Sequence, residues 1–507
     1  MKKLDKIRSA LTGLDRRNLL GRGAAAVGGL FAAQFLRTGT ASAAQARPAP
    51  AAKAPETFTV VGVGEMMVTR PFQSRTEPEF QGILKMMRES DLTYGHLEMN
   101  IGAPDELKWT PRGTAGVASY MIAGPQIARD LKWAGIDVMS LAMNHSFDWG
   151  PEGILSTIKH CEQNGIAHAG TGINLEAARS PGFFEKDKGR CAIVSLASGN
   201  NAYEWAGHPK AEIPGRPGMN PLRVATRYEV PHAAAEQLKA IGKSLGVMSN
   251  AAAARKEFGL GPGGGNVGGT GTAGFAFVDG DKYNITSIGH AKDIEYNLRS
   301  VDEAAKMADF VIVAQHNSTS EAGRGDGPSA FVVDFARKAI DAGADIYFGH
   351  GWHTFLGIEI YKNKPIIYGM GNFFMEEVFL QRIPADSYES YGIDLDKLTS
   401  ANPAIGNLHP GTDAEDWCWT AVYQLKFVDR KISEIRLYPV DMGMDFSSGK
   451  GVMNRFVGRG PNKYIDGIPH LATGTNGQKI LEKLQARNKL RGTTMEIQGN
   501  VGVIKVS

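Results

Sequence analysis

The stretch GIDVMSLAMNHSFDWG, residues 135–150, decides the fold class of this 507-residue chain. A short apolar run over residues 137–142 stands directly before the polar pair Asn144-His145, which predicts a buried strand that ends in a polar turn. Pro151 and Gly165 bracket the next segment and predict a helix over residues 151–164. A strand, a polar turn and a helix in succession form a unit of an α/β fold.

The same alternation extends outward from this unit in both directions. Strands are predicted at 58–63, 92–94, 191–196, 310–314 and 346–348, and helices at 79–88, 125–133, 301–308 and 329–342. Hairpins are predicted over 275–288 around Asp279-Gly280, over 357–368 and over 419–439. Strand–helix repeats followed by hairpins favour a system of mixed sheets with helices packed outside them.

Residues 1–43 have the three parts of a secretory signal: a basic leader, an apolar run over 23–36 and the small residues of Ala41-Ser42-Ala43. The pair Arg16-Arg17 indicates a twin-arginine-type export signal. The apolar run is shorter than the about 20 residues that span a bilayer. We therefore expect cleavage and a periplasmic or other extracytoplasmic location, with an uncleaved anchor helix as the alternative. Residues 44–56 read as an Ala/Pro-rich linker.

The charge balance argues against a nucleic-acid partner. The chain holds 56 Lys/Arg and 53 Asp/Glu, but residues 1–43 contain eight of the basic and two of the acidic residues. The remainder is therefore slightly acidic, and no basic footprint supports nucleic-acid binding. Three cysteines exclude a dense disulfide framework and leave room for one bridge, whose pair the sequence does not select.

Metal-competent side chains follow five predicted strands. They are Glu65, Glu98, Asn144-His145, His316 and the loop pair His350 and His353. Because ligands bind beyond the carboxyl ends of strands in open α/β sheets, these side chains are expected to converge. Carboxylate, amide and imidazole groups together suit a divalent cation such as Mn, Zn, Fe or Mg. Taken singly, each has a plainer interpretation as a solvated carboxylate, a helix cap, a turn residue or an interior histidine.

The motifs around these residues resemble those of the CapA-like capsule-synthesis family, which is associated with poly-γ-glutamate export or anchoring. The similarity lies in residues 135–150, in the Gly-His loop over 343–353, in residues 365–373 and in two short motifs at His316 and 169–172. It implies an α/β sandwich of mixed sheets flanked by helices, of the calcineurin-like metallophosphoesterase type. It implies one such domain over 57–440, with a Gly-rich insertion near 259–274 and a C-terminal extension over 441–507.

The resemblance also implies roles for individual residues. The metal would be held by Glu65, Glu98, Asn144, His316, His350 and His353. His145 would act as the catalytic proton donor, and the metal would activate the attacking water. Trp352 and Asn372 would contact the substrate. The implied function is synthesis, export or anchoring of an anionic cell-surface polymer, by metal-dependent hydrolysis or transfer on that polymer or on a phosphoester, within a membrane polymer-synthesis complex.

Several motif positions depart from the family pattern. Glu65 stands where Asp is usual, His96 and Met143 each replace an Asn, and Gly351-Trp352 occupy the middle of the His-rich loop. These changes fit one metal or none as well as two. The competing prediction is therefore a non-catalytic polymer-binding or assembly factor with a degraded metal site.

A turn-rich loop over residues 215–223 carries Arg216 and Arg223. These two arginines are predicted to bind an anionic ligand such as a carboxylate polymer. An ordinary surface turn is the alternative.

Overall fold

The computed structural model describes residues 57–103, 105–108, 120–245, 270–272, 275–319, 327–376, 418–442 and 467–506. The predicted signal peptide over 1–43, the linker over 44–56 and most of the Gly-rich insertion near 259–274 lie outside these ranges. No helix within them is both long and apolar enough to cross a membrane.

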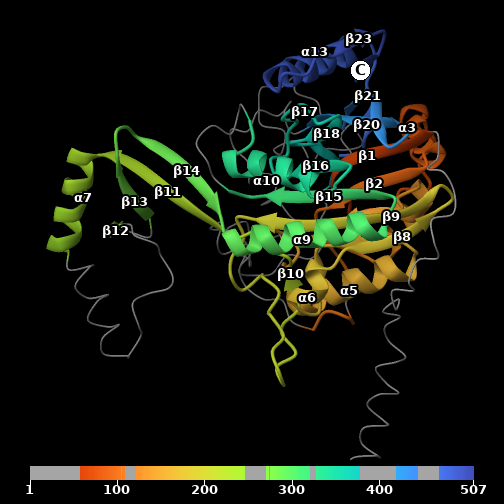
Figure 1. Ribbon diagram of the computed structural model, residues 1–507. Coiled ribbons are helices and arrows are strands. Elements are labelled where there is room, and N and C mark those ends of the chain that lie inside the picture. Colours follow the sequence, from red (N-terminus) through yellow and green to blue (C-terminus); the bar gives the residue numbers. More distant parts are fainter. Residues whose placement is uncertain are drawn as a thin grey trace, which may run out of the picture. The chain divides into compact units, whose positions relative to one another are not determined.

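Two large sheets carry the fold (Figure 1). The ten-stranded sheet runs β23-β24-β21-β20-β1-β2-β5-β6, with β19 beside β1 and β22 beside β21. Its strands are β1 (Thr57–Met67), β2 (Leu92–Leu97), β5 (Val138–Ser140), β6 (Ala167–Ala169), β19 (Asn372–Met375), β20 (Trp419–Val428), β21 (Lys431–Asp441), β22 (His470–Leu471), β23 (Glu496–Gln498) and β24 (Val501–Lys505). The six-stranded sheet runs β17 (Ile358–Tyr361), β18 (Lys364–Ile367), β16 (Ile346–His350), β15 (Phe310–Asn317), β9 (Gly189–Ser198) and β8 (Gly182–Lys186).

The two sheets pack face to face through a shared apolar core. Tyr94 of β2 stacks on Phe348 of β16 with ring centroids 4.4 Å apart. Phe58 of β1 and Phe310 of β15 lie 5.1 Å apart in the same layer. Such rings bury large apolar areas and join the sheets by offset contacts. The predicted sandwich of mixed sheets is confirmed.

Helices cover the outer faces. On β15, Ile312 points into the core between the sheets, whereas Val311 and Val313 face a second core with the helices α9 (Ala291–Met307) and α10 (Ala330–Asp341). This is the period-two alternation of a strand buried on both faces. The helices α3 (Pro78–Glu89), α4 (Gln126–Ala134), α5 (Gly150–Gln163) and α13 (Gly474–Leu490) pack with the ten-stranded sheet and its flanks.

The predicted hairpin over 275–288 is wrong. The strands β13 (Phe275–Gly280) and β14 (Asn284–Gly289) exist, but β11 (Val224–Pro231) lies between them, parallel to β13 and antiparallel to β14. Alternating hydrophobicity predicts strands without saying which strands pair. This four-stranded sheet also includes β12 (Thr270–Thr272), and α7 (His232–Ser244) contacts it.

Smaller elements complete the described chain. They are the pairs β3 (Asn100–Ile101) with β4 (Ile122–Ala123) and β7 (Thr171–Gly172) with β10 (Gly218–Met219), and the short helix α6 (Leu175–Arg179). The other two predicted hairpins are confirmed as β17–β18 and β20–β21. Cys161, Cys191 and Cys418 are buried and unbridged.

Part of the predicted C-terminal extension joins the main sheet. Within residues 441–507, β24 pairs with β21 and β23 pairs with β24. Helix α13 packs Ile480 and Leu481 into the main core. The domain boundaries themselves remain a prediction, but this segment shares the sheet and the core of the domain.

Close backbone contact at Gly64 gives a test of the strand arrangement. A Cβ added there would lie 1.9 Å from the carbonyl oxygen of Gly371, at the entry to β19. Since backbone cannot move aside without breaking pairing, Gly64→Ala should destabilise the chain by about 3 kcal/mol or more. Urea unfolding followed by circular dichroism measures this. Gly124→Ala, where the added Cβ would meet nothing within 4 Å, is the matched control and should change stability by less than about 1 kcal/mol.

Candidate metal centre

Strand register places one row of polar residues across each sheet. In the ten-stranded sheet Glu65 stands opposite His96 of β2 and opposite Asn372 of β19. In the six-stranded sheet His316 of β15 stands opposite His350 of β16. All these pairings are parallel, so residues in one row project from the same face of their sheet. The two rows face each other across the sandwich.

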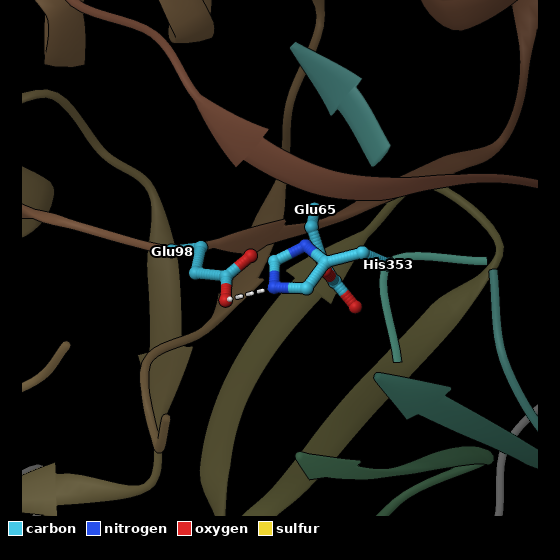
Figure 2. Close-up of side chains that lie close together, drawn as sticks. All are labelled: Glu65, Glu98 and His353. Atoms are coloured by element: carbon cyan, nitrogen blue, oxygen red, sulfur yellow. Dashed lines mark ion pairs between the residues drawn. The ribbon is translucent and has the colours of Figure 1, made fainter. Parts of the chain in front are cut away.

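Three side chains form the centre of this arrangement (Figure 2). Glu65, Glu98 and His353 each offer a ligand atom, and these atoms lie within 4.8 Å of one another. Both carboxylates are fully buried. His353 Nε2 lies 3.6 Å from Glu98 Oε1, and His353 Nδ1 lies 2.7 Å from Glu65 Oε2. Two atoms that share one tetrahedral metal ion at about 2.1 Å are about 3.4 Å apart, so the Glu98–His353 spacing suits a shared ion.

The backbone of the Gly-His loop binds Glu65. The amide of Gly351 donates to Glu65 Oε1 over 2.6 Å. Gly351 has φ +96°, and a Cβ there would lie 2.4 Å from the carbonyl oxygen of Asn317, so only glycine fits. Burial alone raises the pKa of the Glu65 carboxyl, but the charge of His353 and its hydrogen bond outweigh burial and hold that pKa well below its usual range. Glu65 is therefore a charged carboxylate in a buried site.

The His353 ring is held in a strained and defined orientation. Its backbone has φ +54°, a left-handed conformation that is uncommon for a non-glycine residue. Nδ1 also lies 2.7 Å from Asn372 Oδ1, so its hydrogen is shared between this amide and Glu65. Burial opposes the charged form, but Glu98 and Glu65 raise the pKa of His353 well above its usual value. The Nε2 atom is thereby directed toward Glu98.

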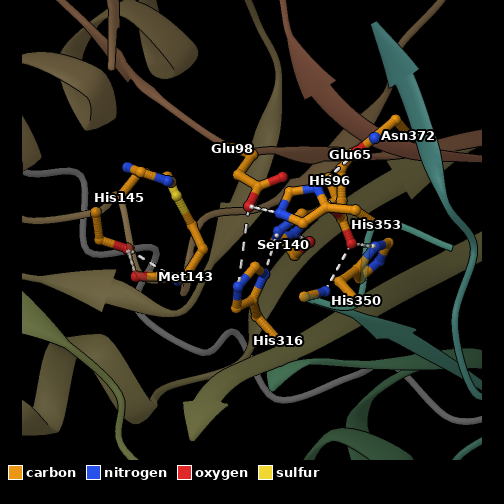
Figure 3. A network of polar contacts seen from close by, with 12 residues as sticks. Glu65, His96, Glu98, Ser140, Met143, His145, His316, His350, His353 and Asn372 are labelled. Atoms are coloured by element: carbon orange, nitrogen blue, oxygen red, sulfur yellow. Dashed lines mark hydrogen bonds and ion pairs between the residues drawn. The ribbon is translucent and has the colours of Figure 1, made fainter. Parts of the chain in front are cut away.

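Three buried imidazoles stack behind the carboxylates (Figure 3). His96 lies between His350, at a centroid distance of 4.1 Å, and His316, at 5.1 Å. Burial lowers the pKa of all three histidines, to about 3 for His350, so the stack is neutral. His96 is a residue of the site that the prediction left out. Its departure from the family motif was visible in the sequence, but its position opposite Glu65 follows only from the strand register.

In His316 and in His350, one ring nitrogen is hydrogen-bonded within the protein and the other faces a carboxylate. His316 Nδ1 bonds His96 Nε2 over 3.0 Å, and its Nε2 lies 4.0 Å from Glu98 Oε1. His350 Nε2 bonds the Tyr94 hydroxyl over 2.7 Å, and its Nδ1 lies 4.0 Å from Glu65 Oε1. Metal-ligating histidines typically use the second nitrogen in this way, to fix the ring.

These residues fit a divalent cation. His350 Nδ1 is buried without a hydrogen-bond partner in the part of the chain that the structure describes. Its gap of 4.0 Å to a charged carboxylate is too long for a hydrogen bond and is wide enough for an ion to bridge. Carboxylate and imidazole donors are suited to Mn, Zn or Fe, and less so to Mg, which prefers oxygen alone.

His145 lies beside the cluster in Figure 3 and is oriented by a buried carboxylate. Its Nδ1 bonds Asp148 Oδ2 over 2.8 Å, and Asp148 also accepts the Met121 amide. Burial is the main cause of the lowered pKa of His316, and the charge of His145 adds a smaller effect. His145 is therefore close enough to His316 for their charges to interact. Asn144, predicted as a ligand, has a buried Oδ1 that no described residue hydrogen-bonds. Asp148 is a further residue that the sequence interpretation did not assign.

The predicted substrate-binding residues have different surroundings. Asn372 is fully buried and bonds His353, which favours a positioning role over contact with a polymer. Arg216 donates to the carbonyl oxygens of Ala202 and Trp205 and so braces its own loop. Trp352 is partly buried against the core of the six-stranded sheet. Arg223 lines a cleft described below.

Comparison with known proteins identifies the family of the chain. Residues 59–377 match the family described as bacterial capsule synthesis protein PGA_cap. An uncharacterized protein of Sinorhizobium fredii, y4sH, is 33% identical over 89% of this chain and 93% of its own length. The capsule biosynthesis protein CapA of Bacillus anthracis is 22% identical over 64% of this chain and 61% of its own. A probable polyglutamine synthesis accessory protein of Mycobacterium tuberculosis is 27% identical over 54% and 53%. The matched residues contain the whole two-carboxylate, four-histidine cluster, and the chain belongs to the PGA_cap family of bacterial capsule synthesis proteins.

Proposed function

We propose that this protein acts in the synthesis, export or anchoring of an anionic cell-surface polymer of the poly-γ-glutamate type, by metal-dependent hydrolysis or transfer on that polymer or on a phosphoester. The observation that carries the proposal is the meeting of Glu65, Glu98 and His353, with ligand atoms within 4.8 Å, at the facing rows of two sheets. Two fully buried carboxylates so close together are unfavourable unless a cation or a protonated group balances them.

The proposed metal would have protein ligands from both sheets and from the loop of His353. Glu65, Glu98, His316, His350 and His353 would hold the metal, with Asn144 as a further oxygen donor. A bound divalent metal supplies Lewis acidity and lowers the pKa of water. The protein supplies fixed ligand orientation, since Gly351 and Asn372 hold Glu65 and His353, and His96 and Tyr94 hold the other two imidazoles.

His145 is placed to transfer a proton. The Asp148 carboxylate engages Nδ1 and stabilises the charged ring, so Nε2 is the atom left to donate to a leaving group. Burial raises the pKa of the Asp148 carboxyl, and its contact with His145 opposes that rise. A buried carboxylate behind a histidine is the arrangement that orients general acids in many hydrolases.

A non-catalytic binding or assembly role is the second candidate, and one observation favours it. His96 fills the space between His316 and His350 and bonds His316 directly. His96 stands where the family pattern has Asn, and its Nε2 is already engaged by His316, so it adds no free ligand atom to the centre. In this second role the protein would hold the polymer without cleaving it, because the centre would lack the ligands that catalysis needs.

Export is the setting that we propose for either role. The twin-arginine-type sequence of residues 1–43 supports it, and the partners would be the anionic polymer and a membrane polymer-synthesis complex.

Metal binding tests the centre directly. The purified full chain should bind Mn²⁺ or Zn²⁺, and metal at about a hundred times Kd should raise the free energy of unfolding by about 2.7 kcal/mol. Glu98→Gln should weaken binding at least about tenfold, because it removes a charged ligand. Calorimetry and thermal unfolding measure both effects. Glu185→Gln, a charge change on an exposed pair with Arg190, should bind metal as the wild type does. No binding by the wild type would contradict the metal centre.

His145→Ala separates the two candidate functions. If His145 is the proton donor, turnover of bis(p-nitrophenyl) phosphate or shortening of poly-γ-glutamate should fall about 10²- to 10⁴-fold, while metal affinity stays the same. Asp148→Asn should cause a loss of similar size, because the amide can keep the ring in place but hold the wrong tautomer. Product assays in Mn²⁺ measure both. Polymer retention without turnover in the metal-loaded wild type would establish the binding role instead.

A further inference from the structure

A second site lies outside the metal centre, in a cleft of about 640 Å³ between α6, α9 and the loop that leads to β11. This volume is within the range of about 300–1,000 Å³ that is usual for ligand pockets. The residues that matter to the argument are Arg179, Trp205, Arg223, Lys292, Tyr296 and Arg299. Four of these six are permanent or near-permanent cations.

Arg223 is the anchored cation of the cleft. Its Nε donates to Asp293 Oδ2 over 2.6 Å, and its Nη2 donates to Asp293 Oδ1 over 2.7 Å. Asp293 is almost fully buried, so this two-point pair neutralises it. The guanidinium also lies 5.8 Å from the ring of Trp205. The first partner of Arg223 is therefore a carboxylate of the protein itself, and its binding of an external anion stays a prediction.

Arg179 is the more loosely paired cation of the cleft. Its side chain is only 12% exposed, and its nearest carboxylate oxygen, on Asp293, is 3.9 Å away. The Nε atom is buried and makes no hydrogen bond to any residue in the described ranges. The ring of Tyr296, 5.0 Å from its Cζ, holds the guanidinium in place. A largely buried guanidinium whose only carboxylate partner is distant and shared with Arg223 is poorly balanced, and an anion that enters the cleft would improve that balance.

The cleft opens toward solvent past two more cations. Lys292 and Arg299 are exposed residues of α9, and both line the cleft. Acidic side chains, Glu176 and Glu303, line it as well. A compact polyphosphate would be repelled by these carboxylates. A polyamide with one carboxylate per unit is compatible with both the cationic and the acidic side chains of the cleft. Its carboxylates would bind the arginines, and its amide N–H groups can donate to Glu176 and Glu303.

We propose that this cleft binds a segment of a carboxylate-bearing polyamide, through Arg179 in its interior and Lys292 and Arg299 at its rim. The inference rests on the proposed function for the polymer class, and it adds where the polymer is held.

A second hollow lies beside the cleft. It has a volume of about 280 Å³ and shares Trp205 with the cleft. Its other walls include Ser318 and Thr319, which follow His316 on the chain by two and three residues. Trp205 is thus the residue that the cleft shares with a hollow walled by the segment after His316.

Binding of a fluorescently labelled γ-linked glutamate decamer to the full chain tests the cleft. The measurement is made by anisotropy in EDTA, so that the metal centre does not contribute. Arg179→Gln and the double variant K292Q/R299Q should each weaken binding about tenfold or more, as expected for loss of charge-assisted hydrogen bonds. The double variant changes exposed residues only, so it tests the site even if Arg179→Gln unfolds.

The controls separate this proposal from the catalytic one. Lys306→Gln removes the same charge from the same helix outside the cleft lining and should leave affinity unchanged. His145→Ala should also bind normally, so failure of catalysis and failure of the cleft are distinct results. Wild-type protein that does not bind the decamer, or cleft variants that bind it fully, would overturn the proposal. Polyphosphate bound as tightly, with the same sensitivity to K292Q/R299Q, would overturn its specificity for carboxylates.

Discussion

The parallel register of β1 between β2 and β19 is the constraint on which the rest of the structure depends. It sets Glu65 opposite both His96 and Asn372. A slip of one residue would turn Glu65 to the other face of the sheet and take its charge away from His353. The register is maintained by backbone contact at Gly64, where no larger residue fits against Gly371. The positions of the site residues are therefore set by the strand pairing.

The apolar core and the polar site belong to the same interface. Tyr94 joins them: its ring stacks on Phe348 in the core between the sheets, and its hydroxyl bonds His350. Packing of the two sheets thus fixes the distance between the rows that carry Glu65 and His316. Neutral stacked imidazoles fill the space between the rows, and the charged groups gather at the open edge around His353. This division keeps the buried charges few and paired, as the low dielectric requires.

Two kinds of charge balance operate in the molecule. At the metal centre, two buried carboxylates face several imidazole nitrogens, an arrangement that favours a cation. In the cleft of Arg179, an interior guanidinium faces a cavity of about 640 Å³, an arrangement that favours an anion. Under the two proposals, the cleft would hold the charge of a polyanionic substrate and the candidate metal centre would act on it. Membership of a capsule synthesis family is consistent with such a ligand.

The sequence by itself determined the α/β class and the strands that lead to the candidate site, and it singled out Glu65, Glu98, His316, His350 and His353 as candidates. It could do so because buried strands and the polar residues at their ends leave a local pattern. Only the tertiary structure showed that His96 lies between His316 and His350, that Asn372 holds His353, and that Asp148 orients His145. It also decided that β11 separates β13 from β14. These features depend on register and on contacts between residues tens to hundreds of positions apart, and hydrophobic periodicity carries no information about such pairing.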